Sequence, residues 1–161
     1  LVDAFSILDS DGADYYLANA NAYKGKLRKL DLELENTLSK IPLKRRVLVS
    51  CEGAFSYLTH DYGMEEAYLW PVNAESQVTP KRMRNLIDKV KKKQIPTIFC
   101  ESTVSSKAQR EVAKASGATF GGIFYVDSLS GADGPASTLL KLQRHNVQLI
   151  QKGLTQISEV K

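Results

Sequence analysis

The sequence contains few of the residues that build disulfide scaffolds or histidine chemistry. Among 161 residues there are two cysteines, Cys51 and Cys100, so at most one disulfide can form. The two histidines are His60, in a turn-like segment, and His145, on the polar stripe of a predicted helix. We interpret both as solvated surface residues without a catalytic role. No apolar run approaches the roughly 18 residues that suggest a membrane span.

An excess of charge of one sign is also missing. The 22 basic side chains nearly balance the 18 acidic ones and are scattered along the chain, apart from a short lysine run at residues 89–93. This distribution does not predict binding to nucleic acid. We interpret the lysine run as a helix end, where cations complement the helix dipole.

The motifs of nucleotide-binding proteins and hydrolases are absent. No G-x-G-x-x-G or Walker A spacing occurs, and the Gly121-Gly122 pair precedes a predicted strand instead of linking a strand to a helix. No nucleophile elbow is present either. These absences argue against nucleotide binding.

The composition that remains is typical of one globular domain. The chain is 43% hydrophobic and 25% charged. A domain of this length buries about 68–70% of the surface that its unfolded chain exposes, so its folding needs no metal or disulfide. The first residue is Leu1 and not methionine, and we expect that upstream residues, such as a signal peptide or a whole lobe, have been removed.

The first quarter of the chain has a helical period. Apolar residues recur in steps of four and three from Tyr16 to Leu38, with charged residues between them, which predicts one long amphipathic helix. Asp11, as a capping carboxylate, and Gly12 mark its start, and Pro42 ends it. Residues 1–8 are predicted as the tail of another helix.

After residue 42, short apolar runs alternate with helical patterns. The predicted strands are residues 47–51, 67–70, 97–100 and 123–126, and the predicted helices are residues 54–62, 80–93, 105–116 and 137–153. Thr79 and Pro80 begin one helix, and Gly153 ends the last. The repeated βαβ units predict an α/β fold, a Rossmann-like parallel four-stranded sheet flanked by helices.

Carboxylates follow three of the four predicted strands: Glu52, Glu101 and Asp127. Ligands of open α/β sheets bind beyond the carboxyl ends of the strands, so these side chains can converge on one rim. A hard divalent cation would relieve their mutual repulsion. The alternative is structural: Glu52 would cap the helix that begins near Ala54, and Asp127 would only start a loop.

The two cysteines end two of the predicted strands. A disulfide can join them if the strands are neighbours, but we interpret each cysteine first as a small buried hydrophobic residue. The cysteine count does not decide the redox environment.

Four segments carry a resemblance when taken together. They are VSCEGAFSYL from Val49, AYLWPVN from Ala67, IFCESTV from Ile98 and IFYVDSL from Ile123. They resemble the metal-specific solute-binding proteins of ABC transporters for manganese, zinc or iron. The resemblance runs essentially from end to end, and the long helix corresponds to the one that bridges the two lobes in that family.

This resemblance implies two α/β lobes with one metal ion between them, held by two histidines from the earlier lobe and by carboxylates from the later one. Residues 1–42 would hold the end of a preceding helix and the bridging helix, and residues 43–161 the C-terminal lobe. Glu101 and Asp127 fall on the carboxylate ligand positions. Neither histidine of this chain matches a histidine ligand, so the chain would carry half of a site.

The resemblance also implies which metal is bound and how it is handled. Zinc-type members tend to have histidine at the position of Glu52, so a carboxylate there favours Mn²⁺, with Zn²⁺ or Fe²⁺ as alternatives; Glu52 itself is expected near the site and not as a ligand. The protein would be periplasmic or otherwise extracytoplasmic and would deliver the cation to an ABC permease. This lobe alone is expected to bind metal weakly or not at all, and its exposed inter-lobe face to favour self-association.

Two other classes of protein compete with this interpretation. A receiver-like or flavodoxin-like signalling or enzyme domain also gathers carboxylates around a divalent cation at strand ends. A receiver domain, however, pairs acidic residues after its first strand, where this chain has Glu52-Gly53, and has an aspartate after its third, where this chain has Glu101. The third hypothesis is a structural interaction domain without a ligand.

Overall fold

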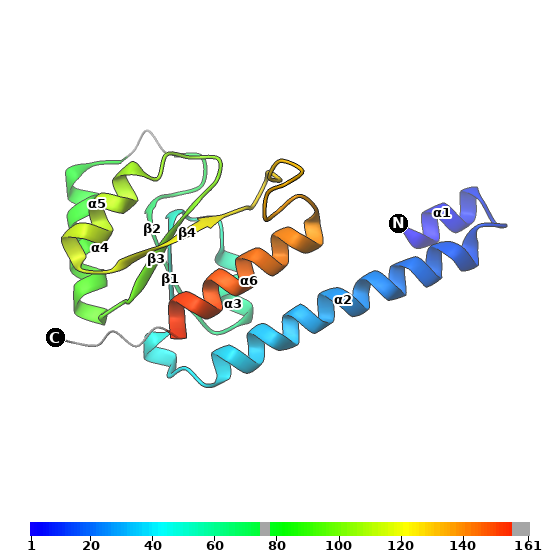
Figure 1. Ribbon diagram of the computed structural model, residues 1–161, viewed down its shortest axis with the longest axis horizontal. Helices are drawn as coiled ribbons and strands as arrows, with labels where there is room; N and C mark the ends of the chain where they lie inside the picture. The colour runs from blue at the N-terminus through cyan, green and yellow to red at the C-terminus, as the bar shows by residue number, and fades with distance from the viewer. Residues whose placement is uncertain (75–77, 156–161) are drawn as a thin grey trace.

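The computed structural model describes residues 1–74 and 78–155, in which helices and strands alternate (Figure 1). Two helices come first, α1 (Val2–Leu8) and α2 (Ala13–Ser39), and a short 3₁₀ helix, η1 (Leu43–Arg45), follows them. The remaining elements are β1 (Val47–Glu52), α3 (Ser56–Asp61), β2 (Glu65–Trp70), α4 (Pro80–Lys93), β3 (Thr97–Glu101), α5 (Lys107–Ser116), β4 (Thr119–Phe124) and α6 (Leu139–Thr155). Within the described residues, no helix is both long and apolar enough to cross a bilayer.

The long helix predicted from the heptad-like period is α2, and α1 precedes it as expected. The predicted cap, however, is wrong: the carboxylate at the start of α2 is Asp9 and not Asp11. Asp9 accepts a hydrogen bond from the backbone N–H of Gly12 at 3.2 Å and one from the hydroxyl of Tyr16 at 2.5 Å. The turn between the two helices places Asp9 over the first turn of α2, a tertiary arrangement that spacing alone does not reveal.

Only the C-terminal third of α2 belongs to the hydrophobic core. Its buried residues are Leu30, Leu34 and Leu38. This part of α2 contacts α6, where the side-chain amide of Gln151 donates to the carbonyl of Glu33 at 3.1 Å and to the hydroxyl of Thr37 at 2.9 Å. The earlier turns of α2 and all of α1 project away from the sheet (Figure 1).

The sheet confirms the predicted α/β fold with parallel strands. β1 pairs with β2 and β3 pairs with β4, both in parallel, and β1 lies beside β3, so the strand order is β2-β1-β3-β4. In the described residues the backbone ladder does not continue between β1 and β3. Gln109 of α5 bridges this gap by donating to the carbonyls of Ser50, at 3.0 Å, and Phe99, at 2.9 Å.

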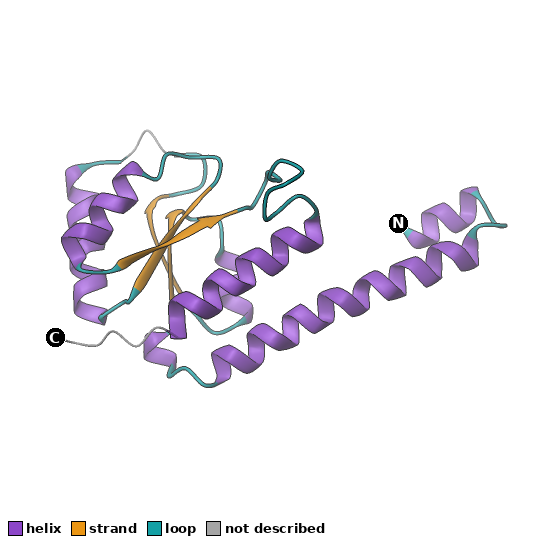
Figure 2. Cartoon of the chain, viewed as in Figure 1, coloured by secondary structure: helices purple, strands orange, loops and turns teal. Residues whose placement is uncertain are grey.

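Helices cover both faces of the sheet (Figure 2). Because successive strand residues point to opposite faces, Val47, Val49 and Cys51 pack toward α4 and α5, whereas Leu48 packs toward α2 and α6. Thr79 caps α4 as predicted, since its hydroxyl accepts from the backbone N–H of Arg82 at 3.2 Å.

Several predicted boundaries differ from the structure by a few residues, and glycine explains two of these differences. β4 spans Thr119–Phe124 instead of residues 123–126, and α6 continues past Gly153. Glycine usually weakens strands and ends helices. Here a Cβ on Gly121 or on Gly153 would lie 2.5 Å from the ring of Phe99. Both glycines therefore make room for one buried aromatic side chain.

This packing predicts opposite effects for one substitution at two helical glycines. Gly153→Ala is expected to lower the free energy of unfolding by about 1–3 kcal/mol, because the added methyl group overpacks against Phe99. Gly25→Ala, where a Cβ meets nothing within 4 Å, is expected to raise it by up to about 1 kcal/mol through helix propensity. Urea unfolding followed by circular dichroism measures both. A stabilised Gly153→Ala variant would contradict the packing role.

Candidate functional site

A disulfide joins the C-terminal ends of β1 and β3. Cys51 and Cys100 are fully buried, their Cα atoms lie 4.7 Å apart and their sulfur atoms are bonded at 2.00 Å. Our first interpretation, two separate buried hydrophobic residues, is therefore wrong. The sequence placed both cysteines at strand ends but did not establish that β1 and β3 are neighbours in register.

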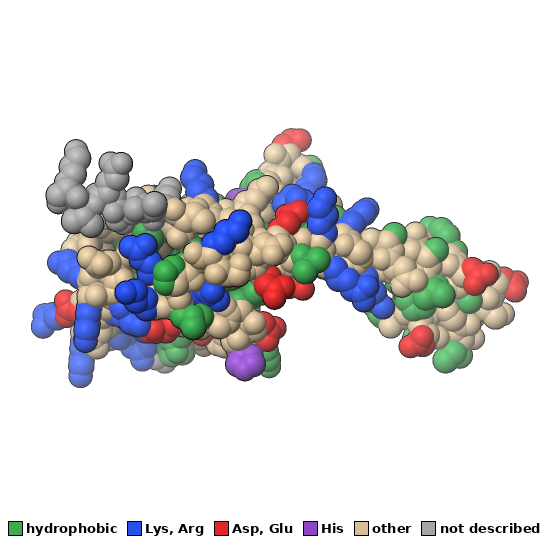
Figure 3. Space-filling model, turned by 90° about the horizontal axis from the view of Figure 1, so that it is seen from below, with side chains coloured by type: hydrophobic (Ala, Val, Ile, Leu, Met, Phe, Trp, Pro, Cys, Tyr) green, Lys and Arg blue, Asp and Glu red, His purple; other side chains and the backbone are tan. Residues whose placement is uncertain are grey.

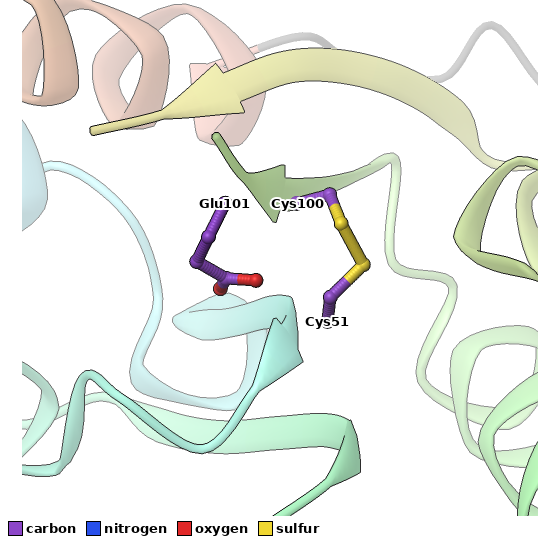
Figure 4. Close-up of side chains that lie close together, drawn as sticks. All are labelled: Cys51, Cys100 and Glu101. Atoms are coloured by element: carbon purple, nitrogen blue, oxygen red, sulfur yellow. A yellow bond between two sulfur atoms is a disulfide. The ribbon is translucent and has the colours of Figure 1, made fainter. Parts of the chain in front are cut away.

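The Glu101 side chain lies next to this disulfide at the end of β3 (Figure 4). It is 2% exposed, and its Oε2 accepts a hydrogen bond from the backbone N–H of Glu52 at 3.2 Å. Its Oε1 is buried without a hydrogen-bond partner among the described residues. Glu101 thus forms a close group with the two cysteines, all ligand atoms lying within 4.8 Å of one another. The sulfur atoms are bonded to each other, which leaves the carboxylate as the available ligand.

The surroundings of Glu101 disfavour its ionised form. Burial raises the pKa of this carboxyl group to about 7, and the nearby negative charge of Glu52 adds to the rise. Backbone N–H groups at Glu101, Glu52 and Cys51 oppose the rise only in part. Near neutral pH the carboxyl group therefore lacks a counter-charge that a cation would supply.

Glu52 connects the ends of β1 and β2 instead of capping a helix. It is partly exposed, and its Oε1 accepts a hydrogen bond from the backbone N–H of Asn73, in the turn after β2. The structural alternative, in which Glu52 caps the following helix, is wrong because Glu66 has this role. Glu66 accepts from the backbone N–H of Phe55 at 2.9 Å and from the hydroxyl of Ser56 at 2.8 Å.

Asp127 lies exposed in the loop after β4. Within the described residues its carboxylate forms no hydrogen bond to Glu52 or Glu101. The residues that follow the two predicted ligands do meet, because the hydroxyls of Ser102 and Ser128 lie 2.7 Å apart. The loops after β3 and β4 are therefore joined, and the three carboxylates belong to the same edge of the sheet.

Side chains of α6 contact the backbone at the end of β4. Asn146 is buried and forms two hydrogen bonds with the backbone of Tyr125, at 3.1 Å to the N–H and 2.6 Å to the carbonyl. His145 is half-buried, with Nε2 2.9 Å from the carbonyl oxygen of Ile123. The interpretation of His145 as a solvated residue is wrong, whereas the exposure predicted for His60 is confirmed, with 87% of its side chain exposed.

Sequence reasoning missed these two supporting side chains, although one signal was present. Asn146 occupies an apolar position of α6, between Leu142 and Ile150 at steps of four. A polar residue on a buried helical face must find a hydrogen-bond partner. The partner is the strand end that leads into the Asp127 loop.

This arrangement matches a known family. The family described as "Zinc-uptake complex component A periplasmic" (ZnuA) matches residues 1–153. The chain is 48% identical over 148 residues to the iron-binding protein YfeA of Yersinia pestis, and 30% identical over 146 residues to the manganese ABC transporter substrate-binding lipoprotein PsaA of Streptococcus pneumoniae. These alignments cover 92% and 91% of this chain but 48% and 47% of the relatives. The chain thus spans about half the length of the curated relatives that it matches.

Solved structures show the same likeness. A Mn-bound periplasmic metal-binding protein from Candidatus Liberibacter asiaticus is 38% identical, has a TM-score of 0.84, and is matched over 95% of this chain and 56% of that one. The periplasmic zinc-binding protein TroA from Treponema pallidum is 25% identical with a TM-score of 0.83, and is matched over 96% of this chain and 58% of that one. The chain belongs to the ZnuA family of metal solute-binding proteins, which are transport components and not enzymes. The receiver-like alternative is thereby set aside.

The raised pKa of Glu101 predicts how stability depends on pH. The folded chain keeps a proton on Glu101 up to a pKa of about 7, whereas the unfolded chain releases it near 4.5. The contribution of this group is therefore complete below pH 4.5 and is lost as the pH rises to 7. Relative to Glu101→Gln, the metal-free chain is expected to lose about 3 kcal/mol across this range.

Urea unfolding at several pH values in the presence of a chelator measures this loss. Glu111→Gln, which removes an exposed carboxylate on α5, is the matched control and is expected to preserve the parent profile. Parallel profiles for the parent chain and Glu101→Gln would show that Glu101 titrates normally.

Proposed function

We propose that this chain is the C-terminal half of an extracytoplasmic solute-binding protein that captures a divalent metal cation and delivers it to an ABC permease. Residues 1–42 would bridge to another lobe, and residues 43–161 would form the lobe that supplies carboxylate ligands. One observation carries the proposal. The buried Glu101 has an oxygen without a hydrogen-bond partner at the edge of the sheet where Glu52 and the Asp127 loop also lie, in a chain of a metal-binding family.

The chemistry of this edge suits capture and release. Carboxylate oxygens bind hard divalent cations, and binding to Glu101 would displace its proton, so that metal affinity depends on pH. No bond of a substrate is made or broken. The chain offers only part of a coordination shell, and the histidine ligands implied by the family resemblance would come from the other lobe. We therefore expect weak or no binding by this chain alone.

The donor set favours manganese among the candidate cargo ions. The carboxylates that the described residues place at this edge are those of Glu52, Glu101 and Asp127. Oxygen donors suit Mn²⁺, whereas zinc sites typically use nitrogen and sulfur donors. The two relatives described above are named for iron and for manganese. Of the two solved structures, one holds manganese and the other is named for zinc. We propose Mn²⁺ first, with Fe²⁺ and Zn²⁺ as alternatives.

We propose Glu101 and Asp127 as the ligands, with Glu52 beside them. Glu52 lies next to Glu101, because the backbone N–H of Glu52 donates to the Glu101 carboxylate. Glu101 is the more buried and Glu52 the more exposed of the two. Removing each carboxylate separately distinguishes them.

Calorimetric titration with Mn²⁺ tests the proposal in the two-lobe protein formed by this chain and a preceding lobe. Glu101→Gln and Asp127→Asn are each expected to weaken binding by at least tenfold, since each removes an anionic oxygen ligand, while Glu111→Gln is expected to bind as the parent does. Loss of binding in Glu52→Gln but not in Glu101→Gln would transfer the ligand role to Glu52. Absence of binding to Mn²⁺, Fe²⁺ and Zn²⁺ would overturn the proposed function.

The end of the chain formed by α1 and the start of α2 supports a contact with another lobe. Its apolar side chains are strongly exposed: Phe5 at 49%, Ile7 at 83%, Leu8 at 84%, Tyr15 at 70% and Leu17 at 51%. Single exposed apolar residues are common, but a contiguous group marks an interaction surface. We propose that this end self-associates when the chain is studied alone.

Light scattering across a concentration series measures this association. The average mass is expected to rise with concentration in the parent chain, and to fall toward that of a monomer in the Ile7→Ser, Leu8→Ser variant. Tyr57→Ser is the control, because Tyr57 is 91% exposed but lies on α3. A parent chain that is monomeric at every concentration would contradict the association.

A further inference from the structure

The N-terminal edge of the sheet carries a basic end that the metal site does not use. It consists of residues 40–46, with four basic side chains and no acidic one, and residues 88–94, with four basic and one acidic. The first segment leads into β1 and the second precedes β3. Because the strands are parallel, this basic end lies opposite the carboxylates that follow the strands.

The two segments meet around one hollow. A cavity of about 540 Å³ is lined by Pro42, Lys44, Arg45, Lys92, Lys93 and Gln94. None of the described residues that line it is acidic. Figure 3, which views the molecule from below, shows basic side chains over the lobe and along the middle of the long helix α2, whereas the end that carries α1 shows acidic and apolar side chains.

Part of this charge is already paired, and part is free. Lys89 and Lys93 form ion pairs with Glu65, the first residue of β2. Lys44, Arg45 and Lys92 are exposed and form no ion pair with any of the described residues. The two paired lysines thus anchor the end of α4, whereas the other three present unneutralised charge to the solvent.

An exposed apolar side chain adjoins this charge in the sequence. Leu43, next to Lys44 and Arg45 in η1, is 69% exposed, and Pro42 beside it is also exposed. A soluble anion gains little from an exposed leucine. Both features interact favourably with a bilayer that has acidic headgroups, because basic side chains bind its phosphates and apolar residues enter its interface.

We propose that the basic end, centred on Leu43, Lys44, Arg45 and Lys92, docks on the surface of an acidic phospholipid membrane. Binding is reversible and depends on salt, since a few basic side chains and one leucine are too weak for permanent anchoring. Docking by this edge leaves the carboxylate edge at the other end of the strands directed away from the membrane and accessible to solvent.

Co-sedimentation of the 161-residue chain with vesicles tests this proposal. The vesicles contain phosphatidylcholine alone or phosphatidylcholine with 30% phosphatidylglycerol, a ratio of about one acidic lipid in three, as suits a polybasic surface. We expect preferential binding to the acidic vesicles that is lost in 0.5 M salt, a concentration at which screening extends over only about 4 Å. Any binding through the apolar α1 end is common to both vesicle types and cancels in the comparison.

Charge reversal locates the surface. Lys44→Glu, Arg45→Glu is expected to reduce partitioning onto acidic vesicles at least tenfold, and Leu43→Ser to reduce it measurably without a change of charge. Lys24→Glu, Lys26→Glu is the matched control, because both lysines are exposed on α2 and the net charge changes equally. Circular dichroism confirms that each variant is folded.

Three results would overturn the proposal. An equal loss of binding to acidic vesicles in the Lys44→Glu, Arg45→Glu variant and in the Lys24→Glu, Lys26→Glu control would show that net charge, and not the basic end, drives binding. Equal binding to both vesicle types would exclude recognition of acidic lipid. Release of the chain by millimolar inorganic phosphate, but not by chloride of the same ionic strength, would assign the hollow to a soluble phosphate anion.

Discussion

The connection between β1 and β3 is the constraint on which the rest of the structure depends. In the described residues these two strands share no backbone ladder, so side chains join the two halves of the sheet. The Cys51–Cys100 disulfide and the buried Gln109 make this connection at the centre of the fold. A cross-link across 49 residues removes chain entropy from the unfolded state worth about 4 kcal/mol on the usual loop-closure treatment. The edge that carries the proposed metal site is thus supported by a disulfide and by side-chain hydrogen bonds.

The same connection explains the electrostatics of Glu101. Joining β1 to β3 places the backbone N–H of Glu52 on one carboxylate oxygen of Glu101 and buries the other without a partner. Burial then raises the pKa of the carboxyl group to about 7. A fold that keeps a carboxyl group in such surroundings is less stable near neutral pH, and under the proposed function a bound cation would restore this stability. Under this proposal, stability and metal capture are coupled through the Glu101 side chain.

Much of the fold could be predicted because its signals are local. The 3.6-residue period of α2, the Thr79-Pro80 start of α4 and the short apolar strands all depend on neighbouring residues. The errors concern contacts between distant segments. The boundaries predicted near Gly121 and Gly153 were wrong because Phe99, whose ring packs against both glycines, is distant from them in the sequence.

Some features of the candidate site could likewise be predicted from the sequence, and others could not. The position of carboxylates after parallel strands could be predicted, and the structure places Glu52 and Glu101 together at one edge with the Asp127 loop joined to it. The disulfide, the capping role of Glu66 and the supporting bonds of Asn146 could not, because each requires strand order or side-chain direction across the fold. Burial of Glu101 likewise follows from three-dimensional packing alone.

The most direct test of the account is to locate the metal. Anomalous diffraction from Mn²⁺-loaded crystals of the two-lobe protein places the ion without reference to affinity. The account predicts one strong peak beyond the C-terminal ends of β1, β3 and β4, within coordination distance of the Glu101 and Asp127 carboxylates. A peak elsewhere on the molecule, or at this edge but bound by neither carboxylate, would contradict it.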